Sequence, residues 1–424
     1  MVGHTLRLIF AYIFKNHRQF IFGLIFGLIA VFSVINFGPR LIKNKNITTF
    51  GIAGNYTPAN LPLTIQEKIS FGLTKIMPDG EATSSAAISY TATDSGKIYI
   101  FNLRRDLYWQ DGKQFIADDV NYNLADVKIT KIDNFSVQFE LAGAFSPMPA
   151  IVSQPLFRPG LLGLGAYKVK SIKNAGRFLQ NISLTKGEEI ILYKFYPTES
   201  ALKTAFKLGE VDSIFLENLT GVTNYSKKEQ VNYTKQAVAF FNTKDGKTGE
   251  KNFRQALLYG LSEFSSFGEQ SVSPIAPTSW AYNPNLKKYK TNLDFAKKTL
   301  KGELKLTTTM ALRPVGEELK KSWENAGLKI NFETSDVIPE NFEVYLTYVE
   351  IPADPDQYQL WHSTSPINIS QYKSPKSDKL LEEGRQSIDA KIRKQIYFDW
   401  QKAITEDVPA AFLFFPKTYT ISRN

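Results

Sequence analysis

Apolar and polar positions alternate most clearly over residues 97–103 (KIYIFNL), a run rich in residues that favour β-strands. Asp111-Gly112 follows, and its glycine supplies the positive φ that a tight turn needs. At residues 117–120 (ADDV), carboxylates stand where the dipole of a helix N-terminus favours negative charge. The pattern predicts a strand, a turn and a helix start, in which Trp109, Asp111 and Asp118 hold the fold and perform no chemistry.

Two amphipathic helices are predicted together with their ends. Residues 198–209 begin with a Thr-Glu-Ser cap region, carry apolar side chains at spacings of three and four, and end in glycine. Residues 389–409 begin with an aspartate cap and end at a proline. Residues 410–415 (AAFLFF) then predict a buried strand. Short β-rich runs between the helical stretches indicate a mixed α/β fold, and these runs are residues 97–103, 136–141, 166–172 and 190–195.

Residues 20–37 (FIFGLIFGLIAVFSVINF) form a run of 18 residues without a charged side chain. A helix of that length spans about 27 Å, enough for the core of a bilayer. A cleavable signal peptide has a shorter apolar core that ends in small residues, and residues 31–33 fit that pattern poorly. We therefore expect an uncleaved anchor, with residues 1–46 forming a cytoplasmic tip, a transmembrane helix and a linker. Three Lys/Arg on each side leave the orientation open on charge alone.

The length and charge of the chain narrow its class. At 424 residues it exceeds what one hydrophobic core usually organises, so two lobes are expected. The net charge is +10, but residues 1–46 hold six Lys/Arg and no acid, which leaves +4 for the rest. An excess that small, without a long basic run, argues against binding to nucleic acid.

Metal and cysteine chemistry are disfavoured by the composition. The chain has no cysteine, which excludes disulfides, thiolate metal sites, cysteine nucleophiles and a lipid-modified N-terminal cysteine. Of its three histidines, His4 and His17 precede the apolar run, so His362 alone cannot build a multi-histidine metal site. We expect no metal and no cofactor.

One catalytic hypothesis can be tested on the sequence. Ser200-Ala201-Leu202-Lys203 fits the S-x-x-K pattern in which a lysine activates a serine. A Lys-Thr-Gly follows at residues 247–249, but the polar run 243–251 around it predicts a surface loop, and no Ser-x-Asn element stands between the two. The sequence therefore predicts no catalytic residue.

A series of motifs resembles the solute-binding proteins of peptide-type ABC importers, an extracytoplasmic family that carries peptides, nickel or oligosaccharides. Residues 103–120 (LRRDLYWQDGKQFIADDV) resemble its F-x-L-R…W-x-D-G…T-A-x-D-V run, and residues 163–167 (GLGAY) resemble its G-T-G-P-Y turn. Residues 199–215 resemble its helix that ends in G-E-V-D before a strand. The similarity covers nearly everything after residue 50, including segments 240–243, 253–257, 354–358, 361–363, 372–375, 378–381 and 406–409.

The resemblance implies an α/β, two-lobed periplasmic-binding-protein-like fold of type II with a hinge, preceded by the N-terminal transmembrane helix. Lobe I is expected at residues 47–240 and 410–424, and lobe II at residues 241–409. Hinge crossings near residues 236–242 and 408–412 would let the cleft open and close around a ligand. The chain is short between residues 120 and 136 and between 261 and 280, where larger members carry segments that frame the cavity.

The resemblance also implies a ligand site near an Asp-Pro segment of lobe II, where an aspartate of the family pairs with the α-ammonium of a peptide. The family's D-Y-x-D-P is altered here, because Ile351 and Pro352 stand where an acidic-aromatic pair is common. Glu350, Asp354 or Asp356 can serve instead, unless the partner is missing. Aromatic walls and a few polar groups are expected in such a pocket, and the predicted ligand-binding residues are Asp354, Asp356, Tyr358, Trp361, His362, Asn368, Trp280 and Tyr282.

The sequence thus predicts a single-pass, membrane-tethered substrate-binding component of an ABC importer. It would capture oligopeptides or dipeptides between its lobes, outside the membrane, and deliver them to the permease subunits. The N-terminus is placed inside because the family's function requires it, and no bond is broken. Two alternatives are a degenerate receptor that senses or scaffolds without transport, and an extracytoplasmic serine hydrolase. The ligand stays open among peptides, nickel complexes and oligosaccharides.

Overall fold

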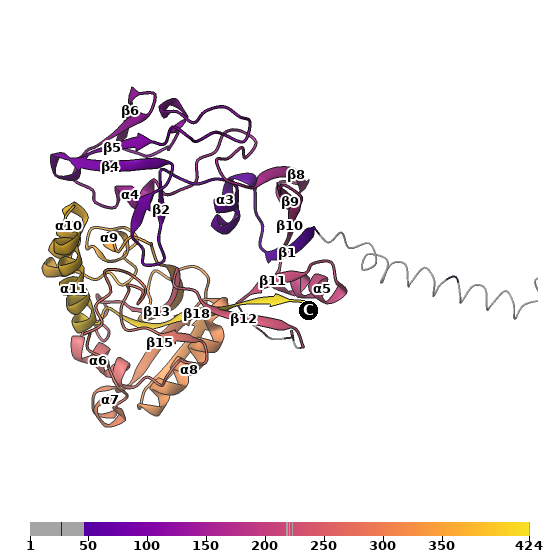
Figure 1. Cartoon of the computed structure of the whole chain (residues 1–424). Helices are drawn as coiled ribbons and strands as arrows, with labels where there is room; N and C mark the ends of the chain where they lie inside the picture. Colours follow the sequence, from indigo (N-terminus) through magenta and orange to yellow (C-terminus); the bar gives the residue numbers. More distant parts are fainter. Residues whose placement is uncertain (1–26, 28–45, 218, 220, 223, 424) are drawn as a thin grey trace, which may run out of the picture.

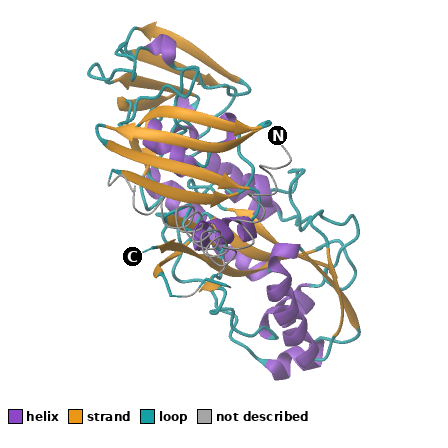
Figure 2. Ribbon diagram, turned by 90° about the vertical axis from the view of Figure 1, so that its right-hand side faces the viewer, coloured by secondary structure: helices purple, strands orange, loops and turns teal. Residues whose placement is uncertain are grey.

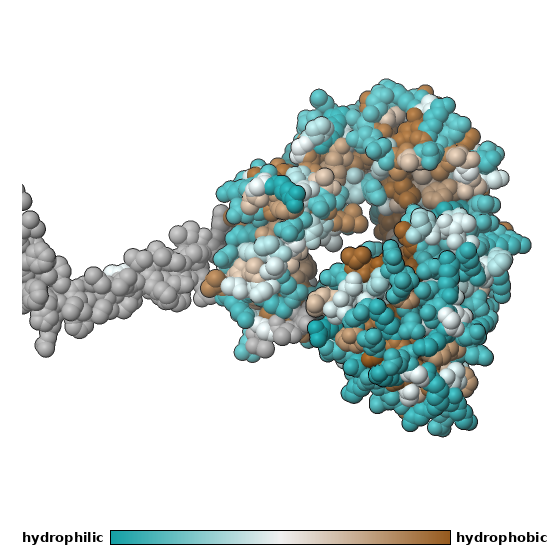
Figure 3. Space-filling view, turned by 180° about the vertical axis from the view of Figure 1, so that it is seen from behind, coloured by the Kyte–Doolittle hydropathy of each residue, from teal (hydrophilic) through white to brown (hydrophobic). Residues whose placement is uncertain are grey.

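The computed structural model describes residue 27, residues 46–217, residues 219, 221 and 222, and residues 224–423 (Figure 1). One continuous sheet runs through two lobes, and a separate four-stranded sheet lies across from lobe II. Figure 2 shows a broad layer of strands with helices packed behind it. The space-filling view shows an opening through the molecule between its parts (Figure 3).

Lobe I is a sheet covered by helices on both faces. Alternate residues of one central strand, Ile191, Tyr193 and Phe195, are buried in one core with Ile65 and Ile69 of helix α3, because successive side chains of a strand point to opposite faces. The strands of lobe I are β1 (Ile47–Ala53), β8 (Lys168–Ala175), β9 (Phe178–Lys186), β10 (Glu189–Tyr196), β11 (Ser213–Leu216) and β12 (Ser226–Val231). Its helices are α3 (Leu63–Ile69) and α5 (Glu199–Leu208), with the 3-10 turn η1 (Pro58–Asn60).

The separate sheet, which we call the small sheet, has its own core around Trp109, Phe101 and Phe139. Its strands, in spatial order, are β4 (Ala87–Thr93), β5 (Ile98–Leu103), β7 (Ser136–Leu141) and β6 (Val127–Asp133). Beside it lie the hairpin β2 (Thr74–Ile76) and β3 (Ala82–Ser84), helix α4 (Met148–Ile151), and the 3-10 turns η2 (Asp94–Gly96) and η3 (Ala117–Asp119).

The corner after β5 holds the fold, as predicted, but through a different carboxylate. Trp109 Nε1 donates a 2.9 Å hydrogen bond to Asp119, and Arg158 Nη2 donates one of 2.6 Å to the same side chain. Asp118, the predicted residue, is exposed and pairs with Lys131. The predicted helix start is one 3-10 turn, η3, because Val120 returns to extended backbone with φ −77° and ψ 96°.

Lobe II packs helices against both faces of its part of the sheet. Strand β13 is apolar at every position from Ala237 to Phe241, since its odd residues enter a core with α6 and α8 and its even residues a core with α10 and α11. The strands are β13 (Lys235–Phe241), β14 (Gly268–Gln270), β15 (Glu303–Thr308), β16 (Lys329–Thr334), β17 (Val344–Glu350) and β18 (Ala410–Ser422). The helices are α6 (Lys251–Tyr259), α7 (Leu293–Thr299), α8 (Arg313–Asn325), α9 (Tyr358–Trp361), α10 (Pro375–Gln386), α11 (Ala390–Asp407) and the 3-10 turn η4 (Met310–Leu312).

Strand β18 connects the two lobes. Its first half pairs with β13 through Phe414, and residues 417–422 pair with β12 and β11 of lobe I. The backbone N–H of Asn232 donates to the carbonyl of Pro416, so the second crossing lies beside the first. Both crossings lie closer to lobe I than the predicted ranges. Residues 236–242 fall mostly in β13, and residues 408–412 are the short connection after α11 and the start of β18, at the lobe II part of the sheet. The proposed boundaries at residues 240 and 410 therefore stand at the lobe II ends of the two strands.

Several elements agree with the pattern of the sequence. Helix α5 is capped by Thr198, whose hydroxyl accepts a hydrogen bond from Ala201 N–H, and it ends at Gly209 with φ 85°. Asp389 caps α11 by accepting from Lys391 and Ile392. The predicted anchor at residues 20–37 falls outside the described residues apart from residue 27, and among the helices that are described none is long and apolar enough to cross a membrane.

Candidate functional site

The loop after β17 is held by two ion pairs, one largely buried and one partly buried. Asp354 receives two hydrogen bonds from Arg393, of 2.8 Å from Nη1 and 2.5 Å from Nη2, and the two side chains are only 13% and 8% exposed. Asp356 receives bonds of 3.0 Å and 2.6 Å from Arg385. The carboxylates also cap the loop, since Asp354 accepts from Asp356 N–H and Asp356 from Tyr358 N–H.

The Asp354 carboxylate stabilises the charged form of Arg393. Burial alone would lower the pKa of Arg393, but the neighbouring Asp354 carboxylate outweighs burial and raises that pKa above its ordinary value. The guanidinium of Arg385 lies 4.0 Å from the ring centroid of Tyr358, and that of Arg393 lies 5.5 Å from Trp280. Each predicted aspartate thus has a fixed cationic partner on α10 or α11, and neither is an unpaired acceptor for a ligand ammonium.

The same segment of lobe II touches the small sheet. The backbone N–H of Ser146 donates a 2.7 Å hydrogen bond to the carbonyl of Arg385, and Trp280 N–H donates one of 2.8 Å to the carbonyl of Asp79. Gly80, with φ 83°, lies so close to the loop that a Cβ there would stand 2.5 Å from the carbonyl oxygen of Ala353. These contacts close one side of the opening between lobe II and the small sheet.

A pocket of about 270 Å³ lies at this contact. Lobe II lines it with Trp280, Asp354 and Arg393, and the small sheet and its hairpin line it with Tyr90, Tyr99 and Glu81, among others. Burial raises the pKa of Tyr99 to about 12, and burial with the charge of Glu81 raises that of Tyr90, so both phenols are neutral at pH 7. Among the described residues no cation lies within ion-pair distance of Glu81, which leaves its exposed carboxylate available to a ligand.

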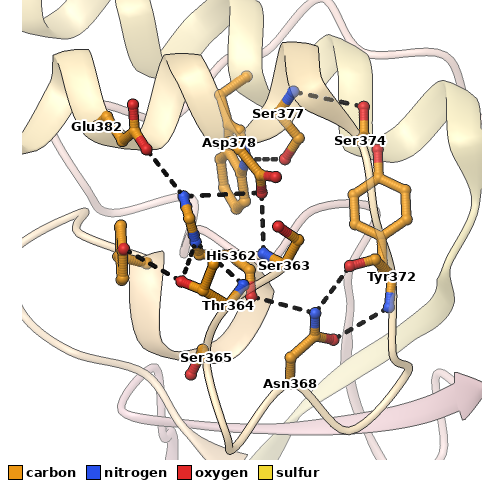
Figure 4. Close-up of polar contacts among 12 residues, drawn as sticks. His362, Ser363, Thr364, Ser365, Asn368, Tyr372, Ser374, Ser377, Asp378 and Glu382 are labelled. Carbon is orange, nitrogen blue, oxygen red and sulfur yellow. Dashed lines mark hydrogen bonds and ion pairs between the residues drawn. The ribbon is translucent and has the colours of Figure 1, made fainter.

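The predicted histidine and asparagine lie in a buried network instead (Figure 4). His362 Nε2 lies 3.2 Å from Glu382, its Nδ1 lies 2.8 Å from the hydroxyl of Thr364, and the residue is 4% exposed. Asn368 donates to the backbone carbonyls of His362 and Tyr372. This network fixes the connection between α9 and α10.

Comparison with known proteins identifies the class of this two-lobed structure. Residues 81–371 match the description "Bacterial extracellular solute-binding proteins, family 5 Middle", which is more than half of the chain. The chain belongs to this family. Family 5 proteins bind solutes without transforming them, so this solute-binding protein is not an enzyme.

Named relatives agree with this assignment. The oligopeptide-binding protein AppA of Bacillus subtilis is 22% identical over an alignment of 459 positions, which covers 86% of this chain and 84% of that protein. The substrate-binding protein CtaP of Listeria monocytogenes has the same fold, with a TM-score of 0.75, 18% identity, and coverage of 89% of this chain and 93% of CtaP. NikZ of Campylobacter jejuni, solved with Ni(L-His), gives a TM-score of 0.71 at 17% identity, with 90% and 94% of the two chains covered.

The structure brings together only part of the predicted site of the solute-binding protein. Asp354 and Trp280 line the pocket, and Asp356 lies two residues from Asp354 in the same loop. Trp361, 1% exposed, belongs to the core of lobe II, and Tyr282 packs against that core. Tyr358 stacks on His362 with ring centroids 4.0 Å apart. The ligand-binding roles of these residues remain predictions.

Residues that the sequence did not single out complete the pocket. Glu81, Tyr90 and Tyr99 come from the hairpin and the small sheet, more than 250 residues before Asp354. Their spacing carries no signal, since only the fold brings them opposite lobe II. The serine hypothesis has no support here, because Lys203 pairs with Glu199 at 2.6 Å on the surface of α5 and Ser200 is exposed.

Proposed function

We propose that this solute-binding protein captures a peptide between lobe II and the small sheet and presents it to an ABC permease. The observation that carries the proposal is the pocket that the unpaired Glu81 carboxylate lines together with two neutral phenols and Trp280. A carboxylate binds an α-ammonium through charge-assisted hydrogen bonds, and aromatic walls accept the apolar parts of a ligand. AppA of Bacillus subtilis, solved with a nonapeptide, and DppA of Helicobacter pylori, solved with the peptide STSA, support a peptide as the ligand.

In this proposal the carboxylates near the pocket have different roles. Asp354 and Asp356, the residues first predicted to bind the ammonium, hold the loop through their arginines, and Glu81 receives the ligand cation. Tyr358, Trp361, His362, Asn368 and Tyr282 support that loop and the helices behind it.

Thermal unfolding of the full chain in the presence of tri- to pentapeptides tests the proposal. A ligand at about 100 times its Kd stabilises the native state by about 2.7 kcal/mol. We expect hits among free peptides that are lost on N-acetylation and in Glu81→Gln, but kept in the control Glu140→Gln, which changes an exposed carboxylate of β7. Hits that survive both changes would contradict the role of Glu81.

We also propose that residues 20–37 anchor the protein, with the N-terminus inside and the folded part outside the membrane. The uncharged run and the extracellular assignment of the family support this. Alkaline carbonate extraction tests it. The wild-type chain is expected to stay in the membrane fraction, and Ile25→Arg combined with Ile29→Arg to be released, whereas Ile88→Arg, at an exposed site of β4, changes nothing. Release of the wild-type chain from the membrane fraction by carbonate would contradict the proposed anchor.

A receptor that senses or scaffolds without transport is the second candidate. Ile351, which stands where an acidic residue is common in the family, is 8% exposed and packs with Ala276 and Phe415. The side chain at this position therefore makes an apolar contact and offers no carboxylate to a ligand. If none of the tri- to pentapeptides stabilises the protein although it is folded, that result would favour this candidate.

A further inference from the structure

Lobe II contains a second cavity that is separate from the contact with the small sheet. Its volume is about 410 Å³, within the range of small-molecule sites, and it shares no lining residue with the pocket around Glu81. It lies where the loop after α6, the segment after β14 and the residues before α7 meet the first half of β18. We call it the lobe II cavity.

The floor of the lobe II cavity is apolar. Leu258, Leu261 and Phe264 line it from α6 and its loop, and Leu413, which packs in the same core, lines it from β18. Strand β14 pairs with β18 from Phe414 onward, and Ser271 N–H, directly after β14, donates a 3.0 Å hydrogen bond to the carbonyl of Leu413, so this segment forms a wall of the cavity. A concave apolar surface of this kind is a site where an apolar ligand gains free energy by displacing water.

The rim of the lobe II cavity is basic. Lys287, Lys288 and Lys290 line it, and within the described part of the chain no carboxylate lies within ion-pair distance of any of the three. The Lys287 ammonium lies 4.6 Å from the ring centroid of Tyr289, which also lines the cavity. Glu263 is the one acidic residue among the described residues that line the cavity, so the rim keeps an excess of positive charge.

We propose that the lobe II cavity binds a small amphiphilic anion, whose apolar body lies on the leucine and phenylalanine floor and whose carboxylate, phosphate or sulfonate meets the lysine rim. Because the floor is apolar and the rim is basic, a ligand that fits the cavity combines an apolar body with a negative charge. A purely apolar molecule would leave the lysines without an anionic partner, and a simple anion would leave the floor in water. This site goes beyond the proposed capture of peptides, because it lies entirely in lobe II.

Lysine footprinting tests the proposal in the full chain, reconstituted in nanodiscs of neutral lipid. The probe is naphthalene-1-sulfonate, and the readout is the rate at which a water-soluble acetylating reagent modifies each lysine. We expect modification of Lys287, Lys288 and Lys290 to slow at least fivefold at saturating probe. Lys297 and Lys298, exposed on α7 and absent from the residues that line the cavity, serve as internal controls whose rates stay constant.

One variant and one control anion separate binding in the cavity from general attraction of anions. Leu261→Trp fills the floor and leaves the lysines in place, so the protection should disappear. Inorganic sulfate at the same concentration should give no protection, because it lacks an apolar body. Protection that persists in Leu261→Trp, that sulfate reproduces, or that is equal at Lys297 and Lys298 would overturn the proposal, as would its absence in the wild-type chain.

Discussion

At the scale of single residues, the Asp354–Arg393 pair is the interaction of the candidate site that depends most on having both partners present. Both side chains are largely buried, so removing one partner leaves an uncompensated charge. We predict that Arg393→Met lowers the free energy of unfolding by about 3–5 kcal/mol, measured by urea denaturation. Lys379→Met, which breaks an exposed pair with Glu383, should change it by less than about 0.5 kcal/mol.

A double variant checks the cause of that loss. Asp354→Asn in the Arg393→Met background removes the stranded carboxylate, so part of the lost stability should return. A single variant as stable as the wild-type chain would show that water reaches Asp354, and the loop would then need another explanation.

Asp119 gives the fold a pH dependence. Burial would raise its pKa, but hydrogen bonds from Trp109 and Arg158 outweigh burial and lower it. A carboxyl whose folded pKa lies below its unfolded value of about 3.9 stabilises the fold above that value, and the contribution is lost as the pH falls through the folded pKa. We predict that acid unfolding between pH 5 and pH 2, followed by circular dichroism, is less steep in Asp119→Asn, a variant that is already less stable at pH 7. Equal slopes would contradict this.

At the scale of elements, the sequence predicts best those helices whose start and end are marked by local capping residues. Helix α5 has a threonine cap, an apolar face and a terminal glycine, all local signals. The start at residues 117–120 also has local signals, but Val120 turns the chain away after one 3-10 turn. A crossing between the lobes was predicted near residues 236–242, which fall mostly in β13. The pairing of β13 with β17 places this strand in lobe II. Pairing between distant strands is not encoded in the local sequence.

The cap of α5 permits a direct test. Thr198→Ala removes the hydroxyl that accepts from Ala201 N–H, so the free energy of unfolding should fall by about 1 kcal/mol. Thr198→Ser keeps an accepting oxygen and is expected to retain most of the stability. Denaturant titration of the two variants compares them, and an equal loss in both would show that the threonine methyl group, not the cap, matters.

At the scale of the whole molecule, the family could be predicted from its ordered motifs and the geometry of the site could not. The partners of Asp354 and Asp356, Arg393 and Arg385, stand 39 and 29 residues later, and nothing in the spacing links them. Glu81 reaches the pocket only because the hairpin contacts the loop before α9. The aromatic residues near that loop were predicted to line a cleft, but Trp361 fills a core, since apolar patterns do not distinguish the two.

The central claim, that lobe II and the small sheet close on a peptide, is tested most directly by a distance between them. The chain has no cysteine, so Thr91→Cys on β4 and Lys321→Cys on α8 give two unique sites for spin labels at exposed positions. Double electron–electron resonance then measures the label separation in the full chain with and without a pool of tri- to pentapeptides. We predict that peptides shorten and narrow the distance distribution, and that Glu81→Gln weakens this response. A distribution that no peptide changes would contradict capture by closure.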